Sequence, residues 1–349
     1  MFHDVSTRDM GRMLVEGSDG RPVPWQQAMT SALYGPSGFF VTAAPDAHFR
    51  TSAHVSDLFV SALLRLVVDT DESLGRPDPL DLVDIGAGRG ELLGRISVLA
   101  PVDLRGRLRL CAVERSPRPP ALPAEIGWTD RMPTPRSLVG LLVATEWLDN
   151  VPLDLAEVDE AGIARYVLVH PLSGEEQLGE PLSAVDHAWA GRWYGGDGTW
   201  PTGTRLELGR PRDAAWGSAV ATLRRGLAIT VDYGHTRDTR PLNGTLTAFR
   251  GGRQVPPVPD GSRDLTAHVA IDAVRAVGEA VAGTPARIMS QHEALTELGV
   301  DASRPPIDQA SADPAGYLRA LAAATQAAEL LAPDGLGGHF WLLQPVVSR

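Results

Sequence analysis

Apolar residues follow two distinct patterns along this chain, and each pattern predicts one kind of secondary structure. In HVSDLFVSALLRLVVDT, residues 54–70, the apolar positions recur at helical spacing and predict an amphipathic helix. Four further segments predict helices: PWQQAMTSALYG, ELLGRISVLA, LTAHVAIDAVRAVGEAV and PAGYLRALAAATQAAELL. Short runs that are apolar almost throughout predict buried strands, and they are PLDLVDI, LRLCAV, SLVGLLVAT, GLAITVDY and HFWLLQPVV.

The order of these segments predicts an α/β fold. Strands that alternate with helices favour a mostly parallel sheet with helices on both faces. Residues 151–225 differ, because LDLAEVDEAGIARYVLVH predicts an antiparallel hairpin and a later Gly-, Trp- and Thr-rich stretch predicts more strands. We therefore expect an N-terminal helical segment over residues 1–78, a sheet domain over 79–150 and 226–349, and a β-rich insertion over 151–225.

The composition narrows the class of protein. The 349 residues carry a formal net charge of −11, which argues against a nucleic-acid backbone as the main partner. All 32 basic residues are arginine, which together with abundant Ala, Gly and Pro indicates a high-GC bacterial genome. The single cysteine, Cys111, indicates a reducing compartment. The sequence contains neither a signal-peptide pattern nor a membrane-length apolar stretch, so we expect a soluble cytoplasmic protein.

A glycine-rich turn, DLVDIGAGRGELL, joins a predicted strand to a predicted helix. Such a turn presents free backbone N–H groups, and its glycines let a ligand approach closely. Three interpretations are open: a dinucleotide site, an S-adenosylmethionine (SAM) site, or a turn without a ligand. The dinucleotide fingerprint needs a third glycine where Glu91 stands. Every second residue of this turn fits instead the first motif of class I SAM-dependent methyltransferases. These residues are Asp84, Gly86, Gly88 and Gly90.

In the SAM interpretation, Gly86, Ala87 and Gly88 make room for the methionine part and the ribose of the cofactor. Glu114 ends the next predicted strand and is placed to accept hydrogen bonds from the two ribose hydroxyls. Trp128 follows a third predicted strand. It either stacks on the adenine or belongs to the core.

Two other features admit both a cofactor role and a structural one. Thr51 and Ser52 either close over the methionine end of SAM, as part of a lid in residues 1–78, or cap the helix that follows. Asp264 and His268 are four residues apart on a predicted helix, but two ligands do not make a metal site and no Cys or His cluster completes one. We predict no metal.

Acidic residues follow two later strands. Glu146 and Asp149 in ATEWLDNVPL are three residues apart, so they share a face on a helical turn. Asp232 and Tyr233 end the strand in VDYGH. Because open α/β sheets bind ligands at the carboxyl ends of their strands, we expect these side chains in one site, with Glu146 and Asp149 as catalytic candidates. Three alternatives are open. In the first, Glu146 serves the cofactor instead of the acceptor. In the second, Glu146 and Asp149 are surface acids, or Asp149 caps a short turn. In the third, Asp232 and Tyr233 of VDYGH belong to an ordinary strand-end turn.

The order of several motifs resembles that of the MidA-like family of class I SAM-dependent methyltransferases. MTSALYGPSGFF with HFRTSAHVS resembles the N-terminal segment of the family, VDIGAGRGELL its SAM loop, and ATEWLDNVP its Asn-Glu-x-x-Asp-Ala-x-Pro pattern. VDYGH, SRDLTAHV and SQHEALTELGV resemble three later motifs. The mitochondrial member of this family is a complex I assembly factor that methylates an arginine of a complex I subunit.

The resemblance implies a Rossmann-like class I methyltransferase fold, SAM as the cofactor, and methyl transfer to the guanidinium of a protein arginine. Glu146 and Asp149 would then bind that planar cation. The insertion over 151–225 would bind the substrate, and a homodimer is a further expectation. Thr145 stands where the family has Asn, which leaves a small-molecule biosynthetic intermediate open as the acceptor. A non-catalytic SAM-fold assembly factor is the remaining alternative.

Overall fold

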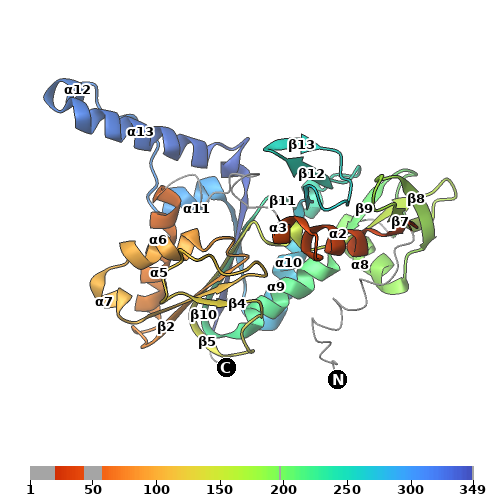
Figure 1. Cartoon of the computed structure of the whole chain (residues 1–349), viewed down its shortest axis with the longest axis horizontal. Helices are drawn as coiled ribbons and strands as arrows, with labels where there is room; N and C mark the ends of the chain where they lie inside the picture. Colours follow the sequence, from red (N-terminus) through yellow and green to blue (C-terminus); the bar gives the residue numbers. More distant parts are fainter. Residues whose placement is uncertain (1–19, 43–56, 196–197, 348–349) are drawn as a thin grey trace. The chain divides into compact units, whose positions relative to one another are not determined.

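The structure, a computed structural model, describes residues 20–42, 57–195 and 198–347. The chain divides into two compact units (Figure 1). The described residues of the first unit are 20–42, 150–212 and 237–268. Those of the second unit are 57–149, 213–236 and 269–347. Each unit is therefore assembled from three separate stretches of sequence.

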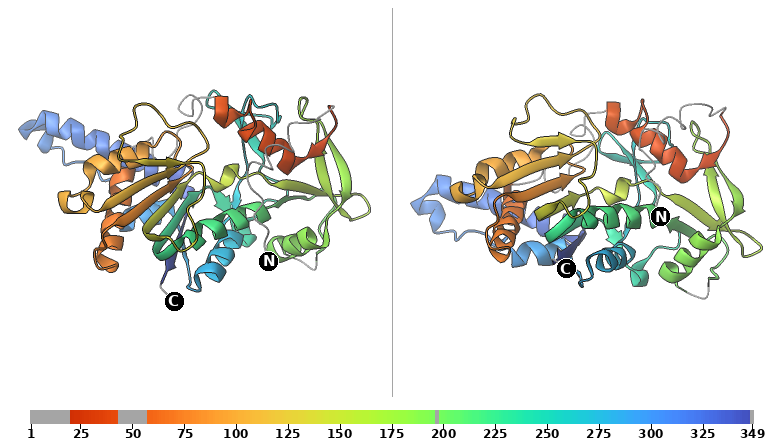
Figure 2. Two further views of the ribbon diagram at one scale, coloured as in Figure 1. Left: turned by 60° about the horizontal axis from the view of Figure 1, so that its bottom comes forward. Right: turned by 90° about the horizontal axis from the view of Figure 1, so that it is seen from below.

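The second unit is built on a seven-stranded sheet in the order β16-β17-β10-β5-β2-β3-β4. Figure 2 shows the ribbon from two further sides. The strands from β10 to β4 pair in parallel, whereas β17 is antiparallel to both of its neighbours. The strands are β2 (Leu80–Ile85), β3 (Leu108–Val113), β4 (Gly127–Thr129), β5 (Leu138–Thr145), β10 (Leu223–Asp232), β16 (Arg287–Ser290) and β17 (Phe340–Val346). A separate parallel pair joins β11 (Gly234–His235) to β15 (Val269–Ala270).

Helices cover both faces of this sheet. The helices of the second unit are α5 (Asp57–Ser73), α6 (Glu91–Leu99), α7 (Val102–Arg105), α10 (Ile271–Ala282), α11 (Gln291–Glu297), α12 (Gln309–Ala312) and α13 (Pro314–Leu331). Helix α9 (Arg210–Thr222) continues from the first unit into the second.

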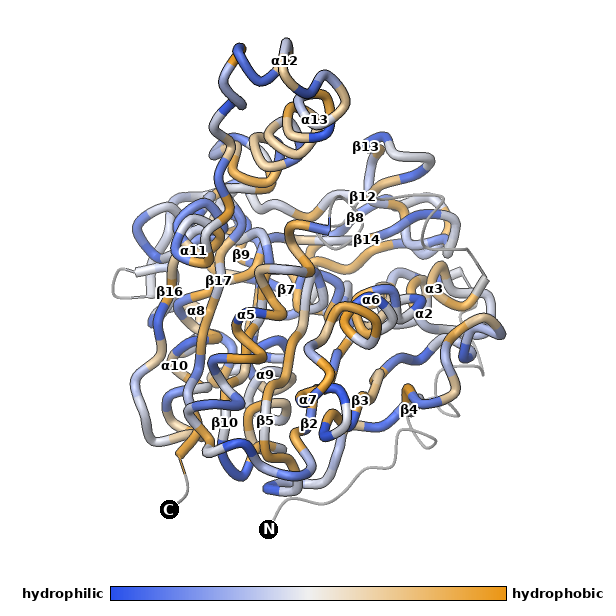
Figure 3. Tube along the Cα trace, turned by 90° about the vertical axis from the view of Figure 1, so that its left-hand side faces the viewer, coloured by the Kyte–Doolittle hydropathy of each residue, from blue (hydrophilic) through white to orange (hydrophobic). Residues whose placement is uncertain are grey.

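The main core of the second unit lies between α5, α6 and one face of the sheet. Phe59 of α5 stacks edge-on against Trp341 of β17, with ring centroids 5.8 Å apart, and Val143 of β5 belongs to the same buried cluster. Strand β5 is hydrophobic along most of its length (Figure 3). Gln344, three residues after Trp341, points to the opposite face because side chains alternate along a strand. There it lies 3.0 Å from the Cβ position of Gly278 in α10.

The first unit is built mainly from antiparallel strands. In its five-stranded sheet β1-β7-β6-β9 lie in that order and β8 pairs with β7, and β13-β12-β14 form a second sheet. The strands are β1 (Val23–Pro24), β6 (Asp154–Val158), β7 (Ala164–Val169), β8 (Glu176–Pro181), β9 (Arg205–Leu208), β12 (Thr247–Arg250), β13 (Arg253–Val255) and β14 (Asp264–Thr266). The helices α2 (Trp25–Tyr34), α3 (Phe39–Thr42) and α8 (Ala184–Tyr194) complete it. Trp25, Met29, Leu155 and Leu265 are buried together in its core.

The α/β fold expected from the sequence is confirmed, as are the hairpin of β6 and β7 and the helix that ends at Gly35. The predicted helix over residues 265–281 is wrong in its first part. The backbone of Asp264 pairs with Phe249 across β12 and β14, and Leu265 is fully buried in the first unit, so this stretch is extended and α10 begins only at Ile271. Asp264 and His268 therefore do not share a helix face.

The observed units also differ from the expected division of the chain. Helix α5 falls within the predicted N-terminal segment, yet its apolar face belongs to the core of the second unit. Residues 237–268 lie in the first unit instead of the sheet domain, because Ala248 and Leu265 are buried in the first unit's core. No helix in the described part of the chain is long and apolar enough to cross a membrane.

Candidate functional site

Four strands of the parallel sheet end at the same level, and this alignment defines the candidate site. Ile85, the last residue of β2, is level with Val113 of β3 and Ala144 of β5, and Val231 of β10 is level with Thr145. The residues that follow these strand ends must therefore lie along one edge of the sheet. Gly86, Glu114 and Glu146 follow β2, β3 and β5, and Asp232 is the last residue of β10.

The glycine turn between β2 and α6 has the conformation that its glycines allow. Gly86, Gly88 and Gly90 have φ values of 70°, 58° and 78°, a region that L-residues with a side chain rarely adopt. The Gly86 N–H donates to the carbonyl of Val113, which fixes the turn to β3. A Cβ at Gly88 would meet nothing within 4 Å, so the backbone there is open to a ligand.

Glu114 is held directly against the glycine turn. The Gly88 N–H donates to its Oε2 at 3.0 Å, and the Ser116 N–H and hydroxyl both donate to its Oε1 at 2.9 Å. A carboxylate oxygen has two acceptor sites, so Oε1 is fully used by Ser116 while Oε2 can still accept one hydrogen bond, as from a ribose hydroxyl. Ala87, the residue between the first two glycines, is 8% exposed.

Trp128 of β4 borders the same turn. Its indole N–H donates to the carbonyl of Ser116 at 3.0 Å, and its ring lies 3.5 Å from the Cβ position of Gly90. The side chain is only partly buried and also packs against the main core of the second unit. The structure therefore places Trp128 beside the glycine turn, with contacts to the core as well.

Trp147 is a neighbour of the turn that sequence reasoning did not select. Its Cδ1, Cβ and Cγ atoms lie 3.0, 3.2 and 3.3 Å from the Cβ position of Gly86. The indole of Trp147 thus lies against Gly86. A side chain larger than hydrogen at residue 86 would displace the indole. The sequence signal was present, because Trp147 follows Glu146 directly in the ATEWLDN motif.

Glu146 and Asp149 are positioned by the short segment after β5. Glu146 has φ of 49°, an uncommon conformation for a residue with a side chain, and its N–H donates to the carbonyl of Val231. Asp149 lies in a 3₁₀ turn (Leu148–Asn150), is 3% exposed, and accepts a hydrogen bond from the hydroxyl of Tyr233. The structure therefore joins Asp149 to one of the two strand-end residues of VDYGH.

Asp232 is fully buried behind the segment that carries Glu146 and Asp149. Its Oδ2 accepts hydrogen bonds from the Leu148 N–H at 3.2 Å and the Thr230 hydroxyl at 3.1 Å. Burial, and then the nearby charges of Asp149 and Glu146, raise the pKa of Asp232 well above its ordinary value. Burial close to other carboxylates thus favours the neutral form of Asp232, whose Oδ2 braces the segment through the Leu148 N–H.

Asp84, the acid of the glycine motif, is buried at the end of β2. Burial, followed by the charges of Glu114 and Glu91, raises the pKa of Asp84 to about 8. Its side chain is 3% exposed. The motif acid is therefore a protonated core group near neutral pH.

Other predicted residues lie elsewhere. Thr51 and Ser52 fall outside the described residues. Asp264 is part of the first unit, where its carboxylate accepts a hydrogen bond from the Asn150 side chain at 2.9 Å. Within the described ranges, no group of three or more His, Cys, Asp or Glu side chains is placed to hold a metal ion.

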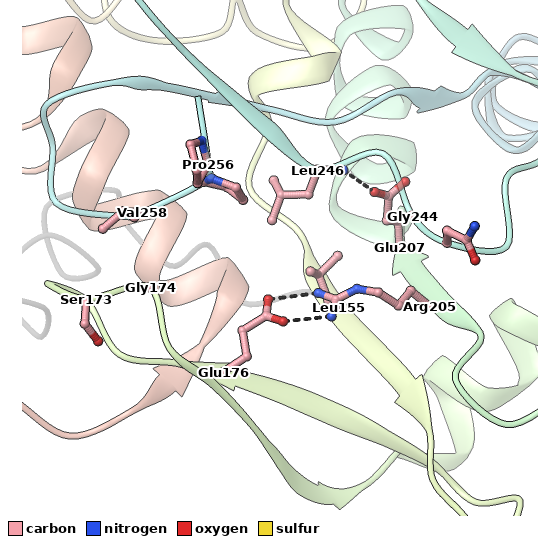
Figure 4. Close-up of a pocket in the computed structure, with 12 residues that line it drawn as sticks. Leu155, Ser173, Gly174, Glu176, Arg205, Glu207, Gly244, Leu246, Pro256 and Val258 are labelled. Atoms are coloured by element: carbon pink, nitrogen blue, oxygen red, sulfur yellow. Dashed lines mark hydrogen bonds and ion pairs between the residues drawn. The ribbon is translucent and has the colours of Figure 1, made fainter. Parts of the chain in front are cut away.

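A cavity of about 420 Å³ lies within the first unit (Figure 4). One wall is apolar and includes Leu155, Leu246 and Val258. The other wall carries Arg205, whose guanidinium donates two hydrogen bonds to Glu176 at 2.7 and 2.8 Å. Because these residues come from β6, β8, β9 and three loops of one unit, the cavity is a property of the first unit alone.

Comparison with known proteins identifies the family. Residues 62–289 match the family model of S-adenosyl-L-methionine-dependent methyltransferases. The chain belongs to this family, and the resemblance to MidA-like methyltransferases is confirmed. The protein is therefore a methyltransferase and its cofactor is SAM. No curated protein matches the chain.

Two solved structures of Burkholderia thailandensis proteins share the fold. One, bound to S-adenosyl-homocysteine (SAH), has a TM-score of 0.73 and 23% identity, with 98% of this chain and 95% of that chain covered. The other, a native crystal structure, has a TM-score of 0.71 and 23% identity, with 99% and 95% covered. The similarity extends over both units of the present chain.

The residues at the sheet edge fit SAM. The open backbone at Gly88 leaves room for the ligand, and Oε2 of Glu114 can accept one further hydrogen bond from a ribose hydroxyl. The aromatic rings of Trp128 and Trp147 lie beside the turn at Gly90 and Gly86 respectively. Hydrogen-bond acceptors and aromatic rings thus border the open backbone of the glycine turn.

Proposed function

We propose that this enzyme transfers the methyl group of SAM to a nitrogen, and that the acceptor is the guanidinium of a protein arginine. The observation that carries the proposal is the meeting of the glycine turn, Glu114, Glu146 and Asp149 at one edge of the parallel sheet. The strand order, with a single antiparallel strand between β10 and β16, supports a Rossmann-like class I arrangement of the second unit.

The cofactor site of this proposal consists of Gly86, Ala87, Gly88 and Glu114. When bound there, SAM supplies an electrophilic methyl group. Glu114 would hold the ribose, and the glycines would let the chain of the cofactor lie against the backbone. Trp128 would border the adenine, and Thr51 and Ser52 remain candidates for the methionine end.

The acceptor site of the proposal is the segment with Glu146 and Asp149. Two carboxylates bind a planar guanidinium with good geometry, and the Tyr233 hydroxyl holds Asp149 in one orientation. The nitrogen lone pair forms the N–C bond while the S–C bond electrons remain on sulfur, and Glu146 takes the proton that the nitrogen releases. Glu146 and Asp149 thus orient the acceptor and complete the proton balance.

A small-molecule acceptor is the second candidate. Thr145, at the end of β5, stands where the family pattern has Asn, so the acceptor side of the site differs from that pattern. An acceptor assay with cell lysate separates the two candidates. Purified enzyme and radiolabelled SAM are incubated with lysate, which is then fractionated by size. We expect label in the protein fraction, at arginine, and label confined to small molecules would refute the arginine proposal.

Variants test the roles of the two acids. We expect Glu146→Gln and Asp149→Asn to lower turnover at least about 100-fold, because general acid–base groups contribute on that order, while SAM affinity changes little. Glu160→Gln, an exposed acid in the β6–β7 turn, is the matched control and should keep full activity. Full activity in both acid variants would show that the acceptor site lies elsewhere.

A further inference from the structure

Trp147 occupies a position that none of the roles above explains. It follows Glu146 at the end of β5, its side chain is half-buried, and its Cβ, Cγ and Cδ1 atoms lie within 3.0–3.3 Å of the Cβ position of Gly86. A core tryptophan would be buried, as Trp216 and Trp341 are in the same unit. Trp147 instead is only partly buried, beside a glycine turn.

The strand order sets the direction in which SAM must extend. Along the sheet the relevant strands lie in the order β5-β2-β3-β4. Glu114 follows β3 and Trp128 lies on β4. A nucleoside whose ribose is held by Glu114 and whose adenine lies toward β4 must direct its 5′ substituent the other way, past β2 toward β5. The sulfonium is part of that 5′ substituent, and Trp147 is the aromatic residue that follows β5.

We propose that Trp147 is a specificity-determining residue that recognises the positive charge of the SAM sulfonium through a cation–π interaction. Aromatic faces attract cations, and Trp does so most strongly. SAH has the same skeleton but a neutral thioether, so this contact favours the charged methyl donor over the neutral product. The inference rests on the proposed placement of the cofactor between Gly86 and Glu114.

Charge alone offers a competing explanation for any preference for SAM. Glu146 and Asp149 belong to the same segment, and their carboxylates also attract a sulfonium. Salt screens only exposed charges well, and Asp149 is 3% exposed, so salt alone does not separate the two contributions. Trp147→Leu leaves both carboxylates in place. A change of the preference for SAM in that variant therefore measures the ring and not the acids.

Isothermal titration calorimetry with SAM and with SAH tests the proposal. The quantity compared is the ratio of the SAH dissociation constant to the SAM dissociation constant, at 0.05 M and 0.5 M NaCl. We expect Trp147→Leu to lower this ratio by about three- to tenfold at both salt concentrations, as a half-buried cation–π contact predicts. Trp147→Phe, which keeps a weaker aromatic face, should give an intermediate ratio.

Two control variants separate this inference from the cofactor placement. Trp128→Leu should weaken SAM and SAH binding equally, because both ligands carry the adenine. Glu114→Ala should also weaken both equally, because both carry the ribose. If Glu114→Ala weakens both ligands but Trp147→Leu leaves the ratio unchanged, the cation–π role is overturned and the placement stands. If Glu114→Ala affects neither ligand, the placement itself is wrong.

A second measurement applies if Trp147→Leu does not fold. Replacing the tryptophans with 5-fluorotryptophan weakens the negative face of each ring while nearly preserving its shape. We expect this replacement to lower the SAH-to-SAM ratio in the native sequence and to leave it unchanged in Trp147→Phe, where the relevant ring is no longer a tryptophan. Equal changes in both proteins would overturn the proposal.

Discussion

Replacement of Asp84 by Asn should change how the stability of this protein depends on pH. Asp84 is 3% exposed, and burial together with Glu114 and Glu91 raises its pKa to about 8. The folded protein therefore keeps this carboxyl protonated, whereas the unfolded chain ionises it near 3.8. Its contribution to stability is fully present below that lower value and is lost as the pH rises through about 8.

The magnitude follows from the two pKa values. The interval from 3.8 to about 8 is roughly four pKa units, and each is worth about 1.4 kcal/mol, so the full effect is about 6 kcal/mol. The interval from pH 5 to pH 7 lies between the pKa of Asp84 in the unfolded chain and its pKa in the folded protein. The native protein should therefore lose about 3 kcal/mol of unfolding free energy through Asp84 alone.

Asn carries no titratable proton, so Asp84→Asn should lack this loss. We expect the free energy of unfolding of the variant minus that of the native protein to rise by about 3 kcal/mol from pH 5 to pH 7. Urea denaturation at closely spaced pH values measures this difference, in which contributions from all other titrating groups cancel. Asp103→Asn, at an exposed position on α7, is the control and should show no such slope. A difference for Asp84→Asn that does not vary with pH would refute the reasoning.

Two further predictions concern the site. In Gly86→Ala the added methyl group meets Trp147 at 3.0–3.3 Å and the residue keeps φ of 70°, so we expect a loss of about 2 kcal/mol in urea denaturation and weaker SAH binding. Gly75→Ala, with φ of 76° and nothing within 4 Å, should lose about 1 kcal/mol and bind SAH normally; equal SAH affinities would contradict the steric argument. Tyr233→Phe leaves Asp149 without that donor and should cost about 2 kcal/mol of unfolding free energy; an unchanged value would show that the hydrogen bond is not stabilising.

Several elements could be predicted because their causes are local in sequence. Apolar periodicity predicted α5 and α13, and continuous apolar runs predicted β2, β5 and β17. The glycine-rich turn was predicted to join a strand to a helix, and it lies between β2, which ends at Ile85, and α6, which begins at Glu91. The ordering of motifs led to the correct family. In each of these cases the deciding residues are neighbours along the chain.

Other features depend on contacts between distant segments. Asp264–Thr266 has a pattern compatible with the start of a helix, but pairing with β12 made it a strand. Residues 237–268 belong to the first unit because their apolar side chains are buried with α2 and β6. Neither outcome can be derived from periodicity, since the partner strand and the partner core are remote in sequence.

The sequence by itself determined the elements, the glycine turn and the acids that could serve a methyltransferase, because spacing and side-chain chemistry are local properties. Only the tertiary structure decided that Trp147 lies against Gly86, that Glu114 binds the Gly88 N–H and that Asp232 is buried behind Leu148. The reason is physical: strand register brings the ends of β2, β3, β5 and β10 to one level, and burial then sets which of the acids there keep their protons.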